Sequence, residues 1–142
     1  MTFDKFTIKA QEAVQSAVNT AQRNGQQTIE PLHLLAGVMD KGKDVVSYVF
    51  QKLGVNIQTV ESAIGNEIAH LPKVSGGGEP YFSSESNQVM QRTMDISQKF
   101  GDEFVSIEPM LLALLAVNST ASRILKDAGC SEQEMTAAIN DL

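Results

Sequence analysis

The sequence has no tryptophan, a single cysteine and only two histidines, and its lysines and arginines form no cluster. One cysteine cannot form an internal disulfide bond, and so few nitrogen and sulfur ligands cannot be combined by spacing into a metal site. A net charge of −6 without a basic cluster argues against a nucleic-acid partner. The composition therefore favours a reducing, cytoplasmic location, with no bound metal and no nucleic acid.

Long apolar runs and catalytic motifs are also missing. The first residues lead into an amphipathic stretch, so we expect no signal peptide and no membrane partner. Gly76, Gly77 and Gly78 are followed by Glu79 and Pro80, which is not the sequence of a phosphate-binding loop. No serine-hydrolase or zinc-protease motif occurs either. A small hydrolase thus has no supporting residues, and we expect no catalytic site and no cofactor in this chain.

Helical periodicity is what the sequence does contain. Apolar residues from Phe6 to Ala21 recur at gaps of three and four, which predicts a long helix capped by Thr7. Similar spacing and helix-ending glycines predict further helices at about 30–39, 44–53 and 56–71. The chain, 142 residues long and 42% hydrophobic, is large enough to bury a core without disulfides or metal.

The helical pattern is duplicated. Thr28-Ile29-Glu30-Pro31 recurs 78 residues later as Ser106-Ile107-Glu108-Pro109, and both copies resemble helix starts. Phe6 aligns with Phe82 at a shift of 76, so the alignment needs two inserted residues near Asp102 and then a shorter loop after the second helix. We therefore predict an all-α fold of two tandem pseudo-symmetric four-helix repeats in one domain, with repeat one at 1–72, a mobile glycine-rich linker at 73–81 and repeat two at 82–142.

Three apolar residues of the second repeat have no apolar counterpart in the first. Ile96 and Phe100 align with Thr20 and Asn24, and Phe104 follows beside Asp102 and Glu103. These side chains either cover the first repeat or form a shallow groove rimmed by carboxylates, suited to an extended apolar peptide with basic flanks. Cys130 and His33, in contrast, are interpreted as packed structural residues.

These features together resemble the N-terminal domain of the Clp AAA+ ATPase family, and the ClpB disaggregases most of all. The resemblance rests on the two repeats, the helix openings that lead into leucines, the glycine-rich linker and the segment Gly101-Asp102-Glu103-Phe104-Val105. It extends from Phe6 to Leu142. Pro109 stands where the family often has histidine, which is the one departure in this pattern.

The resemblance implies a flexible domain on a homohexameric AAA+ ring, which captures unfolded or aggregated polypeptide during a stress response. It assigns functional importance to Thr7, Asp102 and Glu108. With the residues above, the predicted peptide-binding set is Thr7, Ile96, Phe100, Asp102, Phe104, Glu108 and Pro109. ATP and magnesium would be bound by AAA+ modules outside this chain, as would the DnaK system. The alternative within the family is an adaptor-docking domain of a protease-associated ClpA or ClpC unfoldase.

Overall fold

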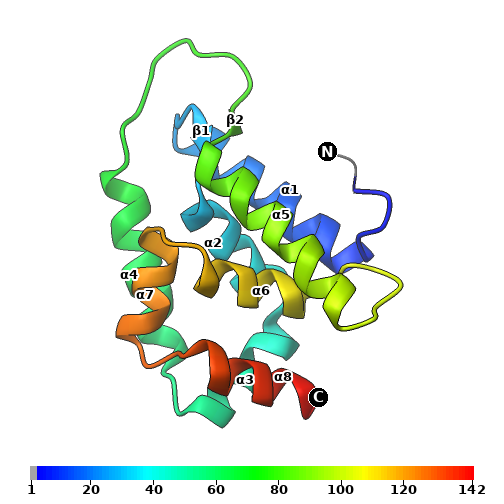
Figure 1. The fold of residues 1–142 in the computed structure, drawn as a ribbon. Helices are drawn as coiled ribbons and strands as arrows, with labels where there is room; N and C mark the ends of the chain where they lie inside the picture. Colours follow the sequence, from blue (N-terminus) through cyan, green and yellow to red (C-terminus); the bar gives the residue numbers. More distant parts are fainter. Residues whose placement is uncertain (1–2) are drawn as a thin grey trace.

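A computed structural model describes residues 3–142 (Figure 1). Each of the predicted helices is present, with ends within about two residues of those expected from the sequence. The elements in chain order are α1 Ile8–Arg23, β1 Thr28–Ile29, α2 Pro31–Lys41, α3 Lys43–Leu53, α4 Ile57–His70, β2 Tyr81–Phe82, α5 Ser84–Lys99, α6 Ile107–Ala116, α7 Thr120–Asp127 and α8 Glu132–Asn140. The all-α fold class is confirmed.

Helices α2 and α6 form the centre of the molecule. In α6, every residue from Ile107 to Leu115 is buried except Glu108, and in α2 all but Ala36 are buried from Pro31 to Met39. A helix that is apolar all round is stable only when other helices surround it. α1 packs on α2 and α5 packs on α6, and α2 also contacts α6 directly, so the two repeats share one core.

The contact between α1 and α2 is the closest in the fold because it is built from small residues. Ala13 and Ala17 of α1 are fully buried against α2. A Cβ atom at Gly37 would collide with the carbonyl oxygen of Ala13, so only glycine allows the two backbones to approach this closely. The second repeat has Ala113 at the corresponding position of α6.

The remaining helices pair across the two repeats, with α3 against α8 and α4 against α7 (Figure 1). Arg123 of α7 lies 3.5 Å from the carboxylate of Glu67 on α4. The Tyr48 hydroxyl donates a hydrogen bond to the carbonyl of Asp141, just after α8. Repeat one and repeat two therefore interlock at their outer helices as well as at the centre.

Two short backbone pairings, which the sequence did not reveal, join the repeats. Strands β1 and β2 are parallel, with Ile29 opposite Phe82. Phe6 forms the equivalent parallel bridge with Val105. Each pairing ties the segment before one long helix to the segment before the opposite central helix, which gives the molecule its approximate two-fold symmetry.

The predicted two-residue insertion near Asp102 is wrong. α5 begins and ends 76 residues after α1, and α6 begins 76 residues after α2. Thr28 lies in a strand, so the helix begins with Glu30 as its N-cap and Pro31 as its first residue, whereas Ser106 occupies the N-cap position of α6. The repeated four-residue motif thus occupies different structural positions, and Pro109 corresponds to His33.

The loop after the second helix is longer in repeat two, although the sequence predicted a shorter one. A single residue, Gly42, separates α2 from α3, whereas residues 117–119 separate α6 from α7. α7 has 8 residues and α3 has 11, so the segment from the start of the second helix to the end of the third is shorter in repeat two despite its longer loop. Gly25, Gly54, Gly101 and Gly129 have positive φ angles and end their helices as predicted.

The glycine-rich segment between Lys73 and Pro80 contains no helix or strand and arches over one end of the molecule (Figure 1). It is anchored to the turn after α1, since the Val74 amide donates to the Gly25 carbonyl and the Gln27 side chain donates to the Glu79 carbonyl. In residues 3–142 we find no helix both long and apolar enough to cross a membrane.

Candidate functional site

The loop from Gly101 to Ser106 organises the candidate site. Gly101 ends α5 with a φ of 73°, a conformation that favours glycine. At its other end, Val105 is held in place because its amide donates to the Lys5 carbonyl at 2.7 Å and its carbonyl accepts from the Thr7 amide at 2.8 Å. The residues in between, Asp102, Glu103 and Phe104, are exposed on a loop with two fixed ends.

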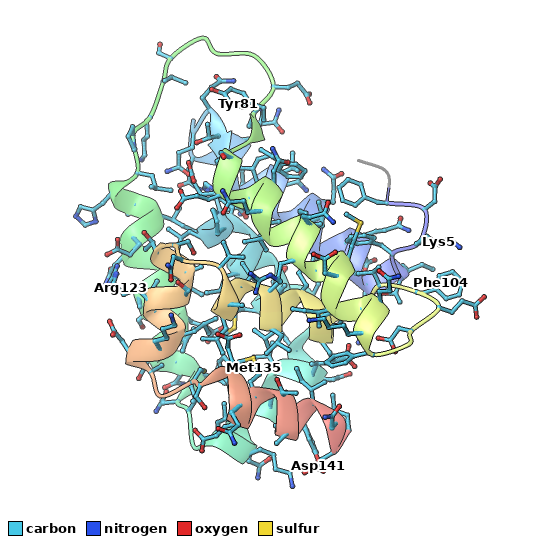
Figure 2. The ribbon with its side chains drawn as sticks, in the orientation of Figure 1. Lys5, Tyr81, Phe104, Arg123, Met135 and Asp141 are labelled. Atoms are coloured by element: carbon cyan, nitrogen blue, oxygen red, sulfur yellow. The ribbon has the colours of Figure 1, made fainter. Side chains whose placement is uncertain are left out.

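A hollow of about 710 Å³, here called the Phe104 hollow, lies between this loop and the end of α8. Phe100 and Phe104 contribute aromatic surface, and half of Phe104 is exposed. Figure 2 shows Phe104 at the edge of the molecule, far from Tyr81 at the other end of α5. The acidic residues of the lining are Asp102, Glu103 and Glu108. Lys99 is the one basic residue among the described residues of this lining.

Ile96 lines a different depression of about 660 Å³, here called the Ile96 hollow. Leu112 of α6 also lines it, with charged residues at its edge. Lys99 lines both hollows, so they adjoin along the last turn of α5. Ile96 and Phe100 are half-buried and pack against the core while still reaching these depressions. The two alternatives left open by the sequence, core cover and exposed groove, therefore both describe these side chains in part.

Thr7 and Pro109 line neither hollow. The Thr7 hydroxyl oxygen accepts a 3.2 Å hydrogen bond from the Ala10 amide and so caps α1. Pro109 is buried in the first turn of α6, where proline is tolerated because the amide there has no helical partner. The structure thus brings together four of the seven predicted residues, Phe100, Asp102, Phe104 and Glu108.

The end of α8 is a part of the site that sequence reasoning missed. Ile139, Asn140 and Leu142 line the Phe104 hollow. The sequence contained one indication of this, since Ile139 aligns with Ile64 of the first repeat. The last helix of each repeat packs against the third helix of the other repeat, α4 on α7 and α8 on α3. A hydrophobic residue near the chain end did not by itself indicate which loop it would face.

His33 is fixed by a buried chain of hydrogen bonds. Its Nδ1 atom accepts from the Glu30 amide at 2.9 Å, its Nε2–H donates to the Gln26 side-chain oxygen at 2.7 Å, and Gln26 donates to the Ile68 carbonyl. Burial lowers the pKa of His33, although the nearby Glu30 carboxylate opposes this shift. This neutral histidine ties α2 to the end of α4.

Cys130 is buried, and burial together with the nearby Glu134 carboxylate raises its pKa to about 11. A thiol with so high a pKa is a poor nucleophile at neutral pH. Within residues 3–142 no three histidine, cysteine, aspartate or glutamate side chains are grouped closely enough to hold a metal ion. The Phe104 hollow combines two aromatic side chains with three carboxylates, a surface suited to binding.

Comparison with known proteins fits this description. The family model for the Clp repeat (R) N-terminal domain matches residues 5–128. The chain belongs to the Clp N-terminal domain family. A curated ClpB chaperone from Bacteroides thetaiotaomicron is 58% identical over 142 residues, which are all of this chain and 16% of that protein. The resemblance to ClpB noted from the sequence is thereby confirmed.

Solved Clp-type domains share the fold. The Hsp104 N-terminal domain from Candida albicans has a TM-score of 0.84 at 22% identity, and the match covers 95% of this chain and 89% of that one. A ClpV N-domain solved in complex with a VipB peptide has a TM-score of 0.72 at 14% identity, covering 94% and 83%. This chain spans about one-sixth of the ClpB relative's length. The family model that matches it is that of a Clp N-terminal domain.

Proposed function

We propose that this domain captures unfolded or aggregated polypeptide for a ClpB-type disaggregase. The observation that carries the proposal is the Phe104 hollow, where exposed aromatic surface lies beside three carboxylates, those of Asp102 and Glu103 on a loop with anchored ends and that of Glu108 in α6. Unfolded chains expose apolar side chains that a native protein buries, and basic residues beside them would be attracted by Asp102, Glu103 and Glu108. The ClpV N-domain bound to a peptide supports binding by this fold.

Capture at such a site is weak and therefore reversible. Burying one or two apolar side chains contributes about 1.5–3 kcal/mol each, from which the cost of association must be subtracted. Attraction between basic residues of the client and the carboxylates adds to this term, and we expect affinities in the micromolar to millimolar range. Weak capture suits a domain that passes its client to an ATP-driven homohexameric ring, built from the AAA+ modules of the same protein. ATP, magnesium and the DnaK system would be bound by those other parts.

An NMR titration tests the proposal. The ¹⁵N-labelled domain is titrated with a capped peptide of leucine and phenylalanine flanked by lysines, here called the apolar peptide, and with a control peptide in which glutamates replace the lysines. We expect shift changes at Ile96, Phe100, Asp102 and Glu108, smaller with the control peptide. Changes confined to another face, or none with either peptide, would count against capture. Tight stoichiometric binding of a folded adaptor would instead support a ClpA-type or ClpC-type role.

A further inference from the structure

Ile96 and Phe100 form an apolar pair that only the second repeat contains. The Phe100 amide donates a 3.0 Å hydrogen bond to the Ile96 carbonyl, so the two residues lie one helical turn apart on the same side of α5. The shift of 76 between α1 and α5 places Thr20 and Asn24 at the corresponding positions of the first repeat. The duplicated fold therefore does not require an apolar pair here.

The two side chains of this pair line different hollows. Ile96 lines the Ile96 hollow together with Leu112 of α6, the helix that packs along α5 (Figure 1). Phe100 lines the Phe104 hollow together with Phe104. Lys99 is exposed and lines both hollows, so it lies at their boundary. A ligand that fills both hollows must therefore supply two separate apolar side chains.

The separation of Ile96 and Phe100 sets a spacing for those two side chains. Four residues of helix rise about 6 Å along the axis. In an extended chain, neighbouring side chains point to opposite faces, whereas residues i and i+2 lie on one face about 6.6 Å apart. Residues i and i+4 of such a chain are about 13 Å apart. Only the i, i+2 spacing matches the apolar pair of α5.

The two hollows differ in charge. The lining of the Phe104 hollow contains the carboxylates of Asp102, Glu103 and Glu108, with Lys99 as the one cation among its described residues. In the lining of the Ile96 hollow, two acidic residues balance two basic ones, namely Asp95, Glu132, Arg92 and Lys99. A basic residue of a ligand is therefore attracted to the Phe104 hollow more than to the Ile96 hollow.

Lys99 offers a polar contact to the middle of such a ligand. It forms no ion pair with a carboxylate of residues 3–142. An extended segment that has left its native fold carries backbone carbonyls without partners. The Lys99 ammonium, which can only donate, is suited to one of these carbonyls between the two apolar side chains.

We propose that the two adjoining hollows bind an extended segment of the client with bulky apolar residues at positions i and i+2, one beside Ile96 and the other beside Phe100, and with a basic residue next to the second. This inference rests on the proposed capture function and names the class of sequence that the same site selects. Alternating apolar residues are typical of strands with one buried face, so the selected class is the amphipathic strand of an unfolded client.

Three capped peptides of identical composition test the spacing. Each contains two leucines among serines, with a lysine at both ends, and the leucines are adjacent, separated by one serine or separated by three. We call them the adjacent, alternate and distant peptides. In a titration of the ¹⁵N-labelled domain, we expect the alternate peptide to shift the amides of both Ile96 and Phe100 and to bind roughly ten-fold more tightly than its isomers.

The outcomes of this titration separate the inference from the capture function. Equal affinities for the three peptides, with shifts at Phe100 and Asp102, would overturn the spacing and leave capture at the Phe104 hollow in place. An absence of shifts at both hollows with all three peptides would count against the spacing and against capture.

The first repeat supplies the variant that removes one apolar contact. Ile96→Thr gives α5 the residue that α1 has at Thr20, so we expect the fold to persist, as measured by circular dichroism. The alternate peptide should then bind no better than the adjacent peptide, whose own affinity should change less than about two-fold because one leucine still fits the Phe104 hollow. A variant that weakened all three peptides equally would show that Ile96 does not hold a separate side chain.

Ile8→Thr is the matched control for this variant. It makes the same substitution at an exposed position of α1 that lines neither hollow, and it should retain the preference for the alternate peptide. Loss of the preference in Ile8→Thr as well would remove the assignment of the spacing to α5.

Two further versions of the alternate peptide test the charge. One carries its only lysine before the first leucine, and the other carries it after the second. Because the excess of carboxylates lies at one hollow, we expect the two peptides to differ in affinity at low salt and to become alike at high salt. Equal affinities at low salt would overturn the place given to the basic residue.

Discussion

The Thr7 amide donates a 2.8 Å hydrogen bond to the carbonyl of Val105, so the residue that caps α1 also holds one end of the loop that carries Phe104. This link explains how Thr7 can matter for capture without touching a peptide. Its side chain stabilises α1, and its backbone positions the loop.

Replacement of Thr7 by alanine should therefore act through stability. Loss of the cap costs about 1 kcal/mol, so we expect a lower free energy of unfolding in urea with unchanged helix content. Thr7→Ser keeps the hydroxyl and should behave as the wild type. An alanine variant that unfolds like the wild type yet loses the apolar peptide would show instead that the Thr7 side chain contacts the ligand.

The His33 hydrogen-bond chain predicts a pH dependence. Because the folded pKa of His33 lies below its unfolded value near 6.5, the unfolded chain binds the proton more readily. Its contribution to stability is complete above pH 6.5 and is lost as the pH falls towards the folded pKa, at no more than about 1.4 kcal/mol per pH unit. Urea unfolding between pH 7.5 and about pH 5.5 measures this slope.

Two histidine variants test whether His33 causes this pH dependence of the free energy of unfolding. His33→Gln should abolish it, and His70→Gln, at an exposed position at the end of α4, should retain it. A free energy of unfolding that stays level or rises as the pH falls would show that His33 does not remain neutral in the folded domain.

Cys130 should be unreactive in the folded domain. With a pKa of about 11 and a buried sulfur, it presents almost no thiolate at pH 7.5. We expect no alkylation by iodoacetamide under native conditions and rapid alkylation in urea, both measured by mass spectrometry. Modification at equal rates in the two conditions would mean that the α8 region opens readily.

Ile96→Asp tests the half-buried apolar residue of α5. The charged side chain should weaken binding of the apolar peptide roughly ten-fold while helix content, measured by circular dichroism, is retained. Asn87→Asp places the same side chain on an exposed part of α5 outside both hollows and should change neither property. A variant at position 96 that fails to fold would assign Ile96 to the core.

The helices were predictable because their signals are local. Thr7 before an apolar stripe and Gly25 after it mark both ends of α1, and the same pattern repeats at α5. The strands were not predictable, since β1 and β2 have two residues each and each pairs with a strand that is distant in sequence. The motif that begins at Thr28 therefore resembles a helix start, whereas the Thr28 hydroxyl donates to Glu30 within the strand-to-helix turn.

The candidate site was predictable only in part. The sequence indicated Phe100, Phe104 and Asp102, because apolar residues that have no apolar counterpart in the first repeat stand there beside acidic ones. Ile96 and Phe104 line different hollows, which adjoin at Lys99, and Ile139 reaches the Phe104 hollow only through the packing of α8. Both follow from tertiary packing, which the spacing of residues in one sequence does not specify.

The most direct test of capture at the Phe104 hollow compares two exposed aromatic residues. Phe104 and Tyr81 are exposed by 50% and 59%, and they lie at opposite ends of α5 (Figure 2). Affinity of a chemically unfolded, fluorescently labelled protein is measured by anisotropy for Phe104→Ser and for Tyr81→Ser. We expect roughly a ten-fold loss for Phe104→Ser and no change for Tyr81→Ser. Equal affinities for both variants and the wild type would contradict capture at this site.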